Sequence, residues 1–317
     1  MSLRSLNSIK SEASRLGFFA CGAARAEPVK GAHADTLLRW IGAGAYANMD
    51  YMVRNAEKRL NPSLLMPEVK SIICVALNYT PAQRIPEGEY QLAYYAYGRD
   101  YHDIMKSKLH ALASACEFPI YRAFCDTAPV LERYWAVRAG IGWIGRNHNL
   151  IIPHAGSMVY LGELFVSEEI DEEDGDNRHG TDNNDTLFNH CGSCHACVDA
   201  CPTKALTVDG ECFYAERCLS YQTIENRGPL SDVAARAVGN TIYGCDRCQQ
   251  ACPWNRHSPP CTEPALQPTE ELLSMKREDW RSLTEEDYRR LFKGSAVKRA
   301  KYEGLMRNIE AAESDTP

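Results

Sequence analysis

The pattern of hydrophobic and polar positions in the first half of the chain predicts alternating strands and helices. Residues 69–79, VKSIICVALNY, form a β-branched apolar run between Pro67 and Pro81, which is typical of a buried strand. Residues 98–116 instead place apolar side chains three or four positions apart, as on one face of a helix. By the same reasoning we expect a helix at about 3–16, strands at 18–24, 118–126 and 158–166, and a helix at 130–140. The first half is therefore predicted to be a mixed α/β fold.

Length and apolar content limit the class of protein. The chain has 317 residues and 44% hydrophobic content, which is enough for a full core and for two domains. It contains no run of about 18 apolar residues, so we expect no transmembrane helix. The segment MSLRSLNSIKSEASRLGFF has the pattern of an amphipathic helix and not that of a secretory signal. We therefore expect a cytoplasmic protein with reduced thiols and no membrane partner.

The negative charge of the chain is concentrated in one segment. The net charge is −7, but residues 166–186 contain nine acidic residues and one arginine, a charge of −8 that leaves +1 for the rest. Such a composition without apolar periodicity is typical of a solvated loop. The overall charge therefore does not exclude a nucleic-acid partner.

The cysteines are distributed unevenly along the chain. Four lie before position 190, and ten lie between positions 191 and 261. We interpret residues 1–185 as a first domain that ends in the acidic loop and residues 186–262 as a cysteine-rich second domain. Residues 263–317 are expected to form a basic, helical C-terminal tail.

The run CGSCHACVDACP, residues 191–202, has the C-x2-C-x2-C-x3-C-P spacing of bacterial ferredoxins. In that arrangement three cysteines hold one [4Fe–4S] cluster and the fourth binds another cluster. A reciprocal set follows in YGCDRCQQACPWN, residues 243–255. We predict that cysteine set 1 (Cys191, Cys194, Cys197 and Cys252) binds one cluster and that cysteine set 2 (Cys201, Cys218, Cys245 and Cys248) binds the other.

Two alternatives accompany this assignment. Cys212 is a rival to Cys218 as a ligand, whereas Cys261 lies outside the pattern. Zinc also binds cysteine pairs, but zinc sites rarely use triplets that end in Cys-Pro. The cysteines of the first half lie in apolar runs and are expected to be buried core thiols: Cys21, Cys74, Cys116 and Cys125. The second domain is therefore predicted to be ferredoxin-like and to carry electrons.

The first half contains no short motif that identifies an electron acceptor. No G-x-G-x-x-G sequence follows a predicted strand, and no G-x-x-x-x-G-K-[ST] loop is present. The residues alone therefore predict an iron–sulfur redox protein whose acceptor is not identified.

Longer blocks of the sequence resemble the epoxyqueuosine reductase family, over a region from about residue 3 to residue 310. They are NMDYMVRNAEKRLNPSLLMPEVKSIICVALNY, YGRDYHDIMKSKL, CDTAPVLERYWAVRAGIGWIGRNHNLI, GSMVYLGEL, the two cysteine runs and LFKGSAVKRAKYEGLMRN. The resemblance implies an α+β protein in which a nitroreductase-like first domain binds cobalamin beside the ferredoxin-like domain. It also implies kinship with reductive dehalogenases.

The activity that this resemblance implies is reduction of epoxyqueuosine to queuosine at the wobble position of tRNA, the last step of queuosine biosynthesis. Conversion of an epoxide to an alkene takes two electrons and two protons, and the oxygen leaves as water. Each cluster passes one electron at a time, so a cofactor that accumulates electrons is needed before the substrate. We expect a monomer that binds the tRNA anticodon loop and receives electrons from an unidentified reductant or donor protein.

The resemblance implies that Asp126, in CDTAPVLER, is the proton donor, since the departing oxygen needs a general acid. Asp126 also precedes a predicted helix with a proline near its start, which is the position of a typical N-cap. His102, with Tyr101 and Asp100 in GRDYH, is a second candidate for contact with the substrate or the cofactor. A histidine at the start of a helix is also commonly a capping or solvated residue.

Other polar residues are candidates for contact with cobalamin or the substrate, together with Tyr101 and Asp126: Arg59, Arg146, Asn147, Ser157 and Ser220. As alternatives, the two arginines could be surface cations and Ser157 could only turn a loop. We expect His195, inside the cysteine run, to face the solvent.

A basic stretch near the C-terminus is a candidate for RNA contact. It contains Arg289, Arg290, Lys293, Lys298, Arg299, Lys301 and Arg307, with Phe292 and Tyr302. Cations neutralise phosphates, and aromatic side chains can stack on unpaired bases. The alternative is an ordinary solvated helix surface.

Two rival functions also fit the sequence. The chain could be an electron-transfer protein that serves another redox enzyme, or a cobalamin-dependent reductase of small molecules such as organohalides. Bound corrin would distinguish either reductase from an electron-transfer protein. Salt-sensitive tRNA binding would distinguish an epoxyqueuosine reductase from a small-molecule reductase.

Overall fold

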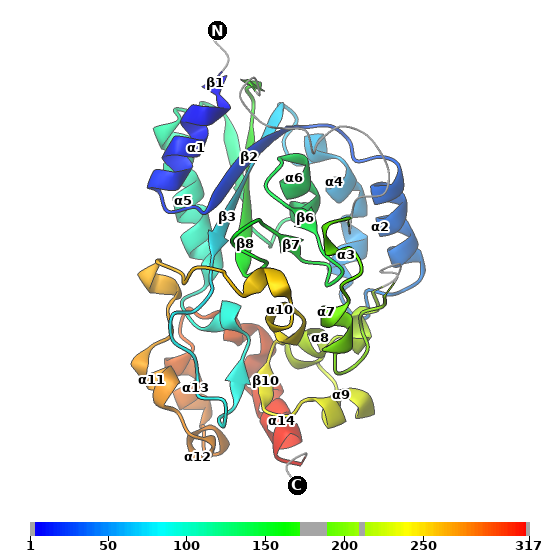
Figure 1. The fold of residues 1–317 in the computed structure, drawn as a ribbon, viewed down its shortest axis with the longest axis vertical. Coiled ribbons are helices and arrows are strands. Elements are labelled where there is room, and N and C mark those ends of the chain that lie inside the picture. Colours follow the sequence, from blue (N-terminus) through cyan, green and yellow to red (C-terminus); the bar gives the residue numbers. More distant parts are fainter. Residues whose placement is uncertain (1–3, 172–188, 209–212, 315–317) are drawn as a thin grey trace.

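The computed structural model describes residues 4–171, 189–208 and 213–314, and its core is a four-stranded antiparallel sheet (Figure 1). The strand order is β2-β3-β8-β5, so β2 and β5 form the edges. The bounds are β2 (Ala20–Arg25), β3 (Ser71–Asn78), β5 (Tyr121–Phe124) and β8 (Val159–Val166). The strands predicted for these four segments are confirmed.

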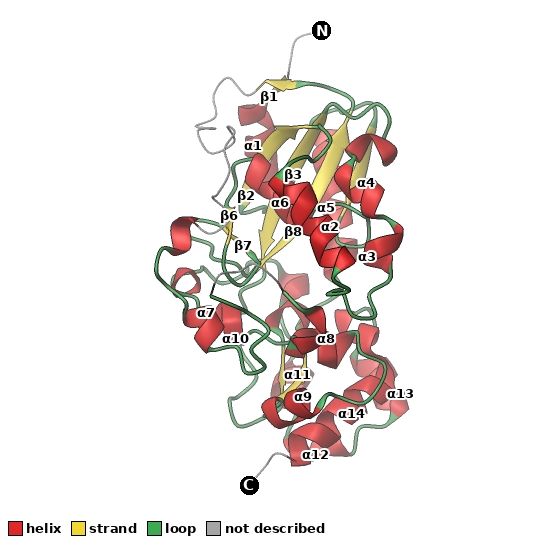
Figure 2. Cartoon of the chain, turned by 90° about the vertical axis from the view of Figure 1, so that its right-hand side faces the viewer, coloured by secondary structure: helices red, strands yellow, loops and turns green. Residues whose placement is uncertain are grey.

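Helices cover both faces of this sheet, which explains why β3 is buried along its whole length (Figures 1 and 2). On one face lie α1 (Leu6–Arg15) and α5 (Tyr101–Ala115), the two helices predicted from apolar periodicity. On the other face lies α6 (Glu132–Arg138), whose Trp135 joins a second hydrophobic core. Apolar side chains on opposite faces of the strands therefore enter two separate cores.

Glycines allow two of these helices to approach the sheet closely. A Cβ atom at Gly162 of β8 would lie 2.7 Å from Met105 Cε of α5. A Cβ atom at Gly22 of β2 would lie 2.1 Å from the carbonyl oxygen of Ala139, directly after α6. A side chain at Gly22 would collide with the backbone after α6, whereas one at Gly162 would force the Met105 side chain to move.

The remaining strands are short, whereas the remaining helices range from one turn to the 14 residues of α14. The strands are β1 (Arg4–Ser5), β4 (Gln91–Leu92), β6 (Trp143–Ile144), β7 (Leu150–Ile151), β9 (Ile170–Asp171) and β10 (Thr241–Tyr243). The helices are α2 (Ala32–Gly42), α3 (Tyr51–Arg54), α4 (Ala56–Leu60), α7 (Ala196–Asp199), α8 (Leu219–Ile224), α9 (Asp232–Ala237), α10 (Arg247–Gln250), α11 (Glu270–Ser274), α12 (Arg277–Arg281), α13 (Glu285–Leu291) and α14 (Lys301–Ser314). Short 3₁₀ turns are η1 (Pro62–Leu64), η2 (Tyr94–Ala96), η3 (Asn189–Cys191), η4 (Ala215–Arg217), η5 (Pro253–Asn255), η6 (Pro264–Leu266) and η7 (Ala296–Ala300).

The segment after the cysteine-rich region packs into the main core. Trp280 and Leu305 are fully buried and belong to the same hydrophobic core as α1 and α5. In addition, β4 of the first half pairs in parallel with β10 of the cysteine-rich region. The domain boundaries at 185/186 and 262/263 therefore stay a prediction. The pair of β4 and β10 joins the regions on either side of the first boundary.

The acidic segment lies mostly in residues 172–188, outside the described residues. Within the described part of the chain, every helix is too short or too polar to cross a bilayer.

Candidate active site

Asp126 lies in a tight turn at the end of β5. Its φ of +54° is in the left-handed region, which is uncommon for a residue other than glycine. The turn is closed by the N–H of Thr127, which donates to the carbonyl oxygen of Cys125 at 2.6 Å. The helix that follows, α6, begins at Glu132 and has Leu131 as its N-cap residue. The alternative that Asp126 caps this helix is therefore wrong.

The first turn of α5 supplies two partners for the Asp126 carboxylate. The hydroxyl of Tyr101 donates to Asp126 Oδ2 at 2.5 Å, and His102 Nε2 lies 3.2 Å from the same oxygen. The other ring nitrogen of His102 lies 2.6 Å from Oδ1 of Asp100. Asp100 is also the N-cap residue of α5, so the capping role considered for His102 belongs to Asp100. The two predicted candidates Asp126 and His102 are thus in direct contact.

These contacts shift the pKa values of both groups. Surrounding protein raises the pKa of Asp126, but hydrogen bonds from His102 and Tyr101 outweigh that effect and hold it below its ordinary value. Burial alone would lower the pKa of His102, whereas the carboxylates of Asp100 and Asp126 raise it to about 9. The side chain of Asp126 is 58% exposed, so its charge remains partly solvated. At neutral pH the pair is therefore a carboxylate beside an imidazolium that holds a transferable proton.

A column of tyrosines runs from Asp126 toward the cysteine-rich region. The ring of Tyr101 stacks on Tyr160 of β8 with 4.3 Å between ring centroids and an interplanar angle of 7°. The ring centroids of Tyr160 and Tyr79 lie 4.6 Å apart, and Gln249 Nε2 of α10 donates to the Tyr79 hydroxyl at 3.1 Å. Because Gln249 directly follows Cys248, this column joins the Asp126 turn to the second cysteine run.

Ser157 lies at the same junction and is buried. Its hydroxyl accepts a hydrogen bond from Asn255 Nδ2 at 3.0 Å, and its carbonyl oxygen accepts one from Gln249 Nε2 at 2.8 Å. The structure thus places Ser157 between the sheet and the segment after Cys252, and its contacts go beyond turning a loop.

Arg59 is buried at the end of α4, with 9% of its surface exposed. Burial lowers its pKa, while Tyr51, Glu132 and Asp126 raise it, so the guanidinium lies within electrostatic range of the Asp126 turn. Its Nε is a buried donor with no hydrogen-bond acceptor among the described residues. The alternative that Arg59 is a surface cation is wrong.

The loop between β6 and β7 contains Arg146 and Asn147. Arg146 donates to the carbonyl oxygens of Cys194 at 2.7 Å and Gly192 at 2.8 Å, and these hydrogen bonds stabilise the backbone of the cysteine run. Asn147 is buried, and its Nδ2 lacks an acceptor within the described part of the chain. This loop therefore lies against the first cysteine run and carries one unpaired donor of its own.

The other polar candidates are less closely placed. Ser220 is half-buried in α8, directly after Leu219, and its carbonyl oxygen accepts from Thr223 Oγ1 at 3.3 Å. The side chain of His195 is 52% exposed and lies 2.7 Å from Asp199, so the prediction that it faces solvent is confirmed.

The cysteines of set 1 lie within electrostatic range of one another. The pKa of Cys197 is raised to about 11, mainly by burial and to a smaller extent by Cys252 and Cys191. Burial also raises the pKa of Cys252, and Cys191 and Cys194 add to that effect. Residues that are far apart in the sequence thus influence one another's pKa, while their assignment to one cluster stays a prediction.

The cysteines of set 2 show the same relation. Burial raises the pKa of Cys245 to about 12 and that of Cys248 well above its ordinary value, and Cys218 adds to both. Burial raises the pKa of Cys218, and Cys201 contributes. Cys197 of set 1 also acts on Cys248, so the two sets adjoin.

The remaining cysteines are separate from these sets. Cys261 is buried in the main core, and Cys212 lies outside the described residues. The expected core thiols Cys74, Cys116 and Cys125 are buried, while Cys21 is half-buried against the same packing. No described cysteine forms a disulfide. No three described His, Cys, Asp or Glu side chains are grouped as ligands of a single metal ion, whereas a [4Fe–4S] cube binds each thiolate at a separate corner.

The basic stretch is only partly available for RNA. Four of its arginines are engaged within the protein: Arg289 with Glu285, Arg290 with Glu271, Arg299 with Glu225, and Arg307 with backbone carbonyls. Phe292 is 2% exposed, so its expected stacking on a base is wrong. The exposed lysines, Lys293, Lys298 and Lys301, form no ion pair with any residue that the structure describes. Arg299 lies close enough to Asp126 to lower the pKa of its carboxyl.

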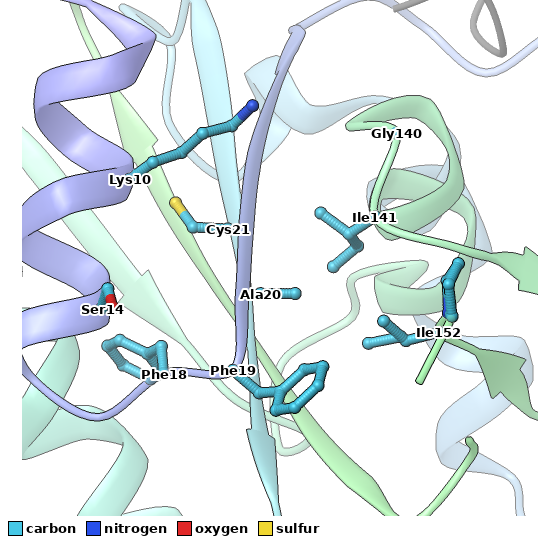
Figure 3. Close-up of a pocket in the computed structure, with 10 residues that line it drawn as sticks. Lys10, Ser14, Phe18, Phe19, Ala20, Cys21, Gly140, Ile141 and Ile152 are labelled. Carbon is cyan, nitrogen blue, oxygen red and sulfur yellow. The ribbon is translucent and has the colours of Figure 1, made fainter. Parts of the chain in front are cut away.

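A hollow of about 400 Å³ lies apart from these residues, at the outer edge of β2 (Figure 3). Lys10 and Ser14 of α1 line it together with Cys21 and Ile141. None of the predicted catalytic, cofactor or cluster residues lines this hollow.

Two family models match the chain. One, described as a 4Fe-4S double cluster binding domain, matches residues 190–255, and the other, described as Epoxyqueuosine reductase QueG, DUF1730, matches residues 59–127. The chain is 39% identical over 310 residues to the epoxyqueuosine reductase of Cellulophaga algicola, with 95% of this chain and 96% of that protein covered. It is 35% identical over 325 residues to that of Pseudomonas aeruginosa, covering 99% and 86%.

The chain belongs to the epoxyqueuosine reductase family. It is therefore an oxidoreductase, and its cysteine-rich region is a double [4Fe–4S] cluster domain, as predicted.

Solved structures of epoxyqueuosine reductases have the same fold. An epoxyqueuosine reductase with an epoxyqueuosine-modified tRNA-Tyr stem loop matches with a TM-score of 0.81 and 27% identity, over 98% of this chain and 80% of that chain. The epoxyqueuosine reductase of Streptococcus thermophilus matches with a TM-score of 0.81, 29% identity and the same coverage. The mixed α/β fold class predicted from the sequence is confirmed.

The structure adds residues to the site that the sequence patterns missed. Tyr160, Gln249 and Asn255 lie between the Asp126 turn and the cysteine-rich region and contact both sides of this junction. Glu132 and Glu163 lie behind the turn, and Glu163 is the single charged residue in the apolar run MVYLGELFV. That isolated charge was a signal in the sequence, since a buried strand rarely carries one.

Proposed function

We propose that this oxidoreductase reduces epoxyqueuosine to queuosine at the wobble position of tRNA, with Asp126 as the proton donor. The observation that carries the proposal is the contact of Asp126 with Tyr101 and His102 at the end of the sheet, joined by stacked tyrosines to the double-cluster domain. The balanced reaction takes the epoxide, two electrons and two protons to an alkene and water. The protons must come from groups at the site.

The Asp126 turn can deliver those protons in a defined order. Asp126 lies in the exposed turn as a carboxylate at neutral pH, so its carboxyl can protonate the departing oxygen only after it has taken the proton of His102. His102 and Tyr101 each touch Asp126 Oδ2, and the imidazolium of His102 can return a proton to it. Asp100 holds the ring of His102 and stabilises its charged form.

We further propose cobalamin as the cofactor beside Asp126, as implied by the family resemblance. The residues fit a corrin, because Arg59 Nε and Asn147 Nδ2 are buried donors that have no acceptor among the described residues, and a corrin is rimmed with amide carbonyls. Tyr101, Arg146, Ser157 and Ser220 are proposed as further contacts to the cofactor or substrate. When bound, cobalamin supplies a cobalt that accumulates reducing equivalents.

The proposed cluster ligands are the two cysteine sets. The influence of Cys252 on the pKa of Cys197, and that of Cys218 on the pKa of Cys248, supports the assignment of each set to one cluster. When bound, the clusters supply single electrons. The boundaries 1–185, 186–262 and 263–317 are proposed as the cofactor, cluster and C-terminal regions.

We propose the tRNA anticodon loop as the substrate, contacted by the exposed lysines Lys293, Lys298 and Lys301 near Arg299. We also propose that the protein acts in the cytoplasm as a monomer, with electrons from a separate reductant or donor protein.

The experiment is anaerobic reconstitution with iron, sulfide and cobalamin, followed by metal analysis and assay on an epoxyqueuosine-containing stem loop. The proposal predicts about eight irons, one cobalt and formation of queuosine. Iron without cobalt and without turnover would favour an electron-transfer protein. Both cofactors with turnover only of small organic substrates would favour a small-molecule reductase.

A further inference from the structure

Two buried carboxyl groups lie directly behind the Asp126 turn. Glu163, in the middle of β8, is 0% exposed, and neither of its oxygens has a hydrogen-bond donor among the described residues. Its neighbours across the sheet are Cys74 of β3 and Phe124 of β5, which offer no positive charge. A buried carboxylate in such a place is costly unless a proton or a partner neutralises it.

The second carboxyl, that of Glu132, is attached to the catalytic turn. Its Oε1 accepts the backbone N–H of Asp126 at 2.5 Å. This bond holds the one residue of the turn whose φ is positive, a conformation that is strained for a residue other than glycine. Glu132 is the first residue of α6, so the bond ties the turn to a helix packed on the sheet.

The two carboxyl groups face each other. Burial and the charge of Asp126 raise the pKa of Glu132 to about 7, although a hydrogen bond with the Glu163 side chain lowers it. Burial, Glu132 and Asp126 raise the pKa of Glu163 well above its ordinary value. As two carboxylates they could only repel, because both would accept and neither would donate. A single proton between them turns the repulsion into a hydrogen bond.

We propose that Glu132 is a positioning residue for Asp126, and that Glu132 and Glu163 share one proton behind the catalytic turn. The inference rests on the proposed function, since it assigns Glu132 a role through Asp126. Glu132 fixes the backbone from which the catalytic carboxylate projects toward Tyr101 and His102. Glu163 supplies the partner that keeps the pair at one negative charge. The other titratable and charged groups that face the pair are Asp126, Cys125, Cys74, Arg133 and Arg59.

The positioning role is tested with Glu132→Ala and Glu132→Gln in the cofactor-loaded enzyme. The glutamine oxygen can still accept the N–H of Asp126, whereas alanine cannot. We expect Glu132→Ala to lower kcat by roughly 10²-fold with little change in KM, and Glu132→Gln to recover most of it. Glu270→Ala, which removes an exposed glutamate from the first turn of α11, is the matched control and should keep wild-type activity. Wild-type kcat in Glu132→Ala, or equal losses in both variants, would overturn the role.

The shared proton is tested without turnover by infrared spectroscopy. We expect the wild type at pH 7 to show a protonated-carboxyl band that disappears at high pH and is missing from the spectrum of Glu163→Gln, so that it remains in the wild-type-minus-variant difference spectrum. A wild type that shows no such band at pH 7, or a band unaffected by Glu163→Gln, would overturn the shared proton. Because the wild-type titration requires no variant, it decides the question even if Glu163→Gln does not fold. Absence of epoxyqueuosine turnover in the wild type would contradict the proposed function and leave this infrared result standing.

Discussion

Different interactions stabilise the Asp126 turn and the cysteine-rich region. In the turn, the carboxylate and the backbone N–H of Asp126 are both bonded to protein groups, through Tyr101, His102 and Glu132. In the cysteine-rich region, thiols from distant segments lie near one another, and burial raises the pKa of Cys197 and Cys245. Metal binding requires thiolates and joins such segments, so the clusters should contribute to folding energy there. The turn should instead keep its geometry independently of iron.

The largest expected effect comes from Cys252→Ser. Removal of this ligand should abolish one cluster, reduce bound iron to about half and bring epoxyqueuosine reduction below detection. The matched control is Cys261→Ser, which removes a buried thiol outside the two sets. Iron analysis and the stem-loop assay check both variants. Full iron content in Cys252→Ser would contradict the assignment of set 1.

A smaller effect is expected for Arg59→Ala. Loss of the buried donor should weaken cobalamin binding by about tenfold, since a hydrogen bond from a charged group is worth roughly 1.5–3 kcal/mol. Iron content should not change, because Arg59 is not a cluster ligand. Titration with cobalamin measures the affinity. Arg54→Ala, an exposed arginine on the neighbouring α3, is the control, and equal affinities of the two variants would remove Arg59 from the cofactor site.

The next effect concerns the Asp126 turn alone and is a change of its stability with pH. The pKa of His102 is raised to about 9 in the folded protein, so its contribution is complete below its unfolded value of about 6.5 and is lost as the pH rises through about 9. We expect roughly 1 kcal/mol of unfolding free energy to disappear between pH 7 and pH 10. His102→Asn should flatten that change, whereas His110→Asn, an exposed position on the same helix, should not. Denaturant unfolding at several pH values measures it, and identical profiles for wild type and His102→Asn would refute the pairing.

The smallest effect is expected on tRNA binding. Lys298→Ala should weaken stem-loop affinity by a few-fold and reduce the slope of log affinity against log salt by about 0.7, the value for one contact with single-stranded nucleic acid. Lys10→Ala, at the distant hollow beside β2, should change neither quantity. Fluorescence anisotropy over a range of salt concentrations checks this. An unchanged slope in Lys298→Ala would exclude this lysine from the interface.

Elements with a strong local pattern could be predicted from the sequence. The apolar run of β3 and the periodicity of α5 predicted both elements, and the cysteine spacing predicted the double-cluster domain. Residues whose role depends on distant neighbours could not be assigned in this way. Phe292 was expected to face RNA but is buried against a core formed after the chain folds back on β10. The position of Asp126 looked like a helix cap because the turn before Glu132 has no signature in the sequence.

The most direct test of the central claim compares wild type and Asp126→Asn in a single turnover on the epoxyqueuosine stem loop, with equal iron and cobalt content. Asparagine keeps the size of the side chain but cannot donate a carboxyl proton. The account predicts normal cofactor and stem-loop binding with a rate of queuosine formation lower by roughly 10²–10⁴-fold. A rate equal to that of the wild type would show that another group protonates the departing oxygen and would contradict the account.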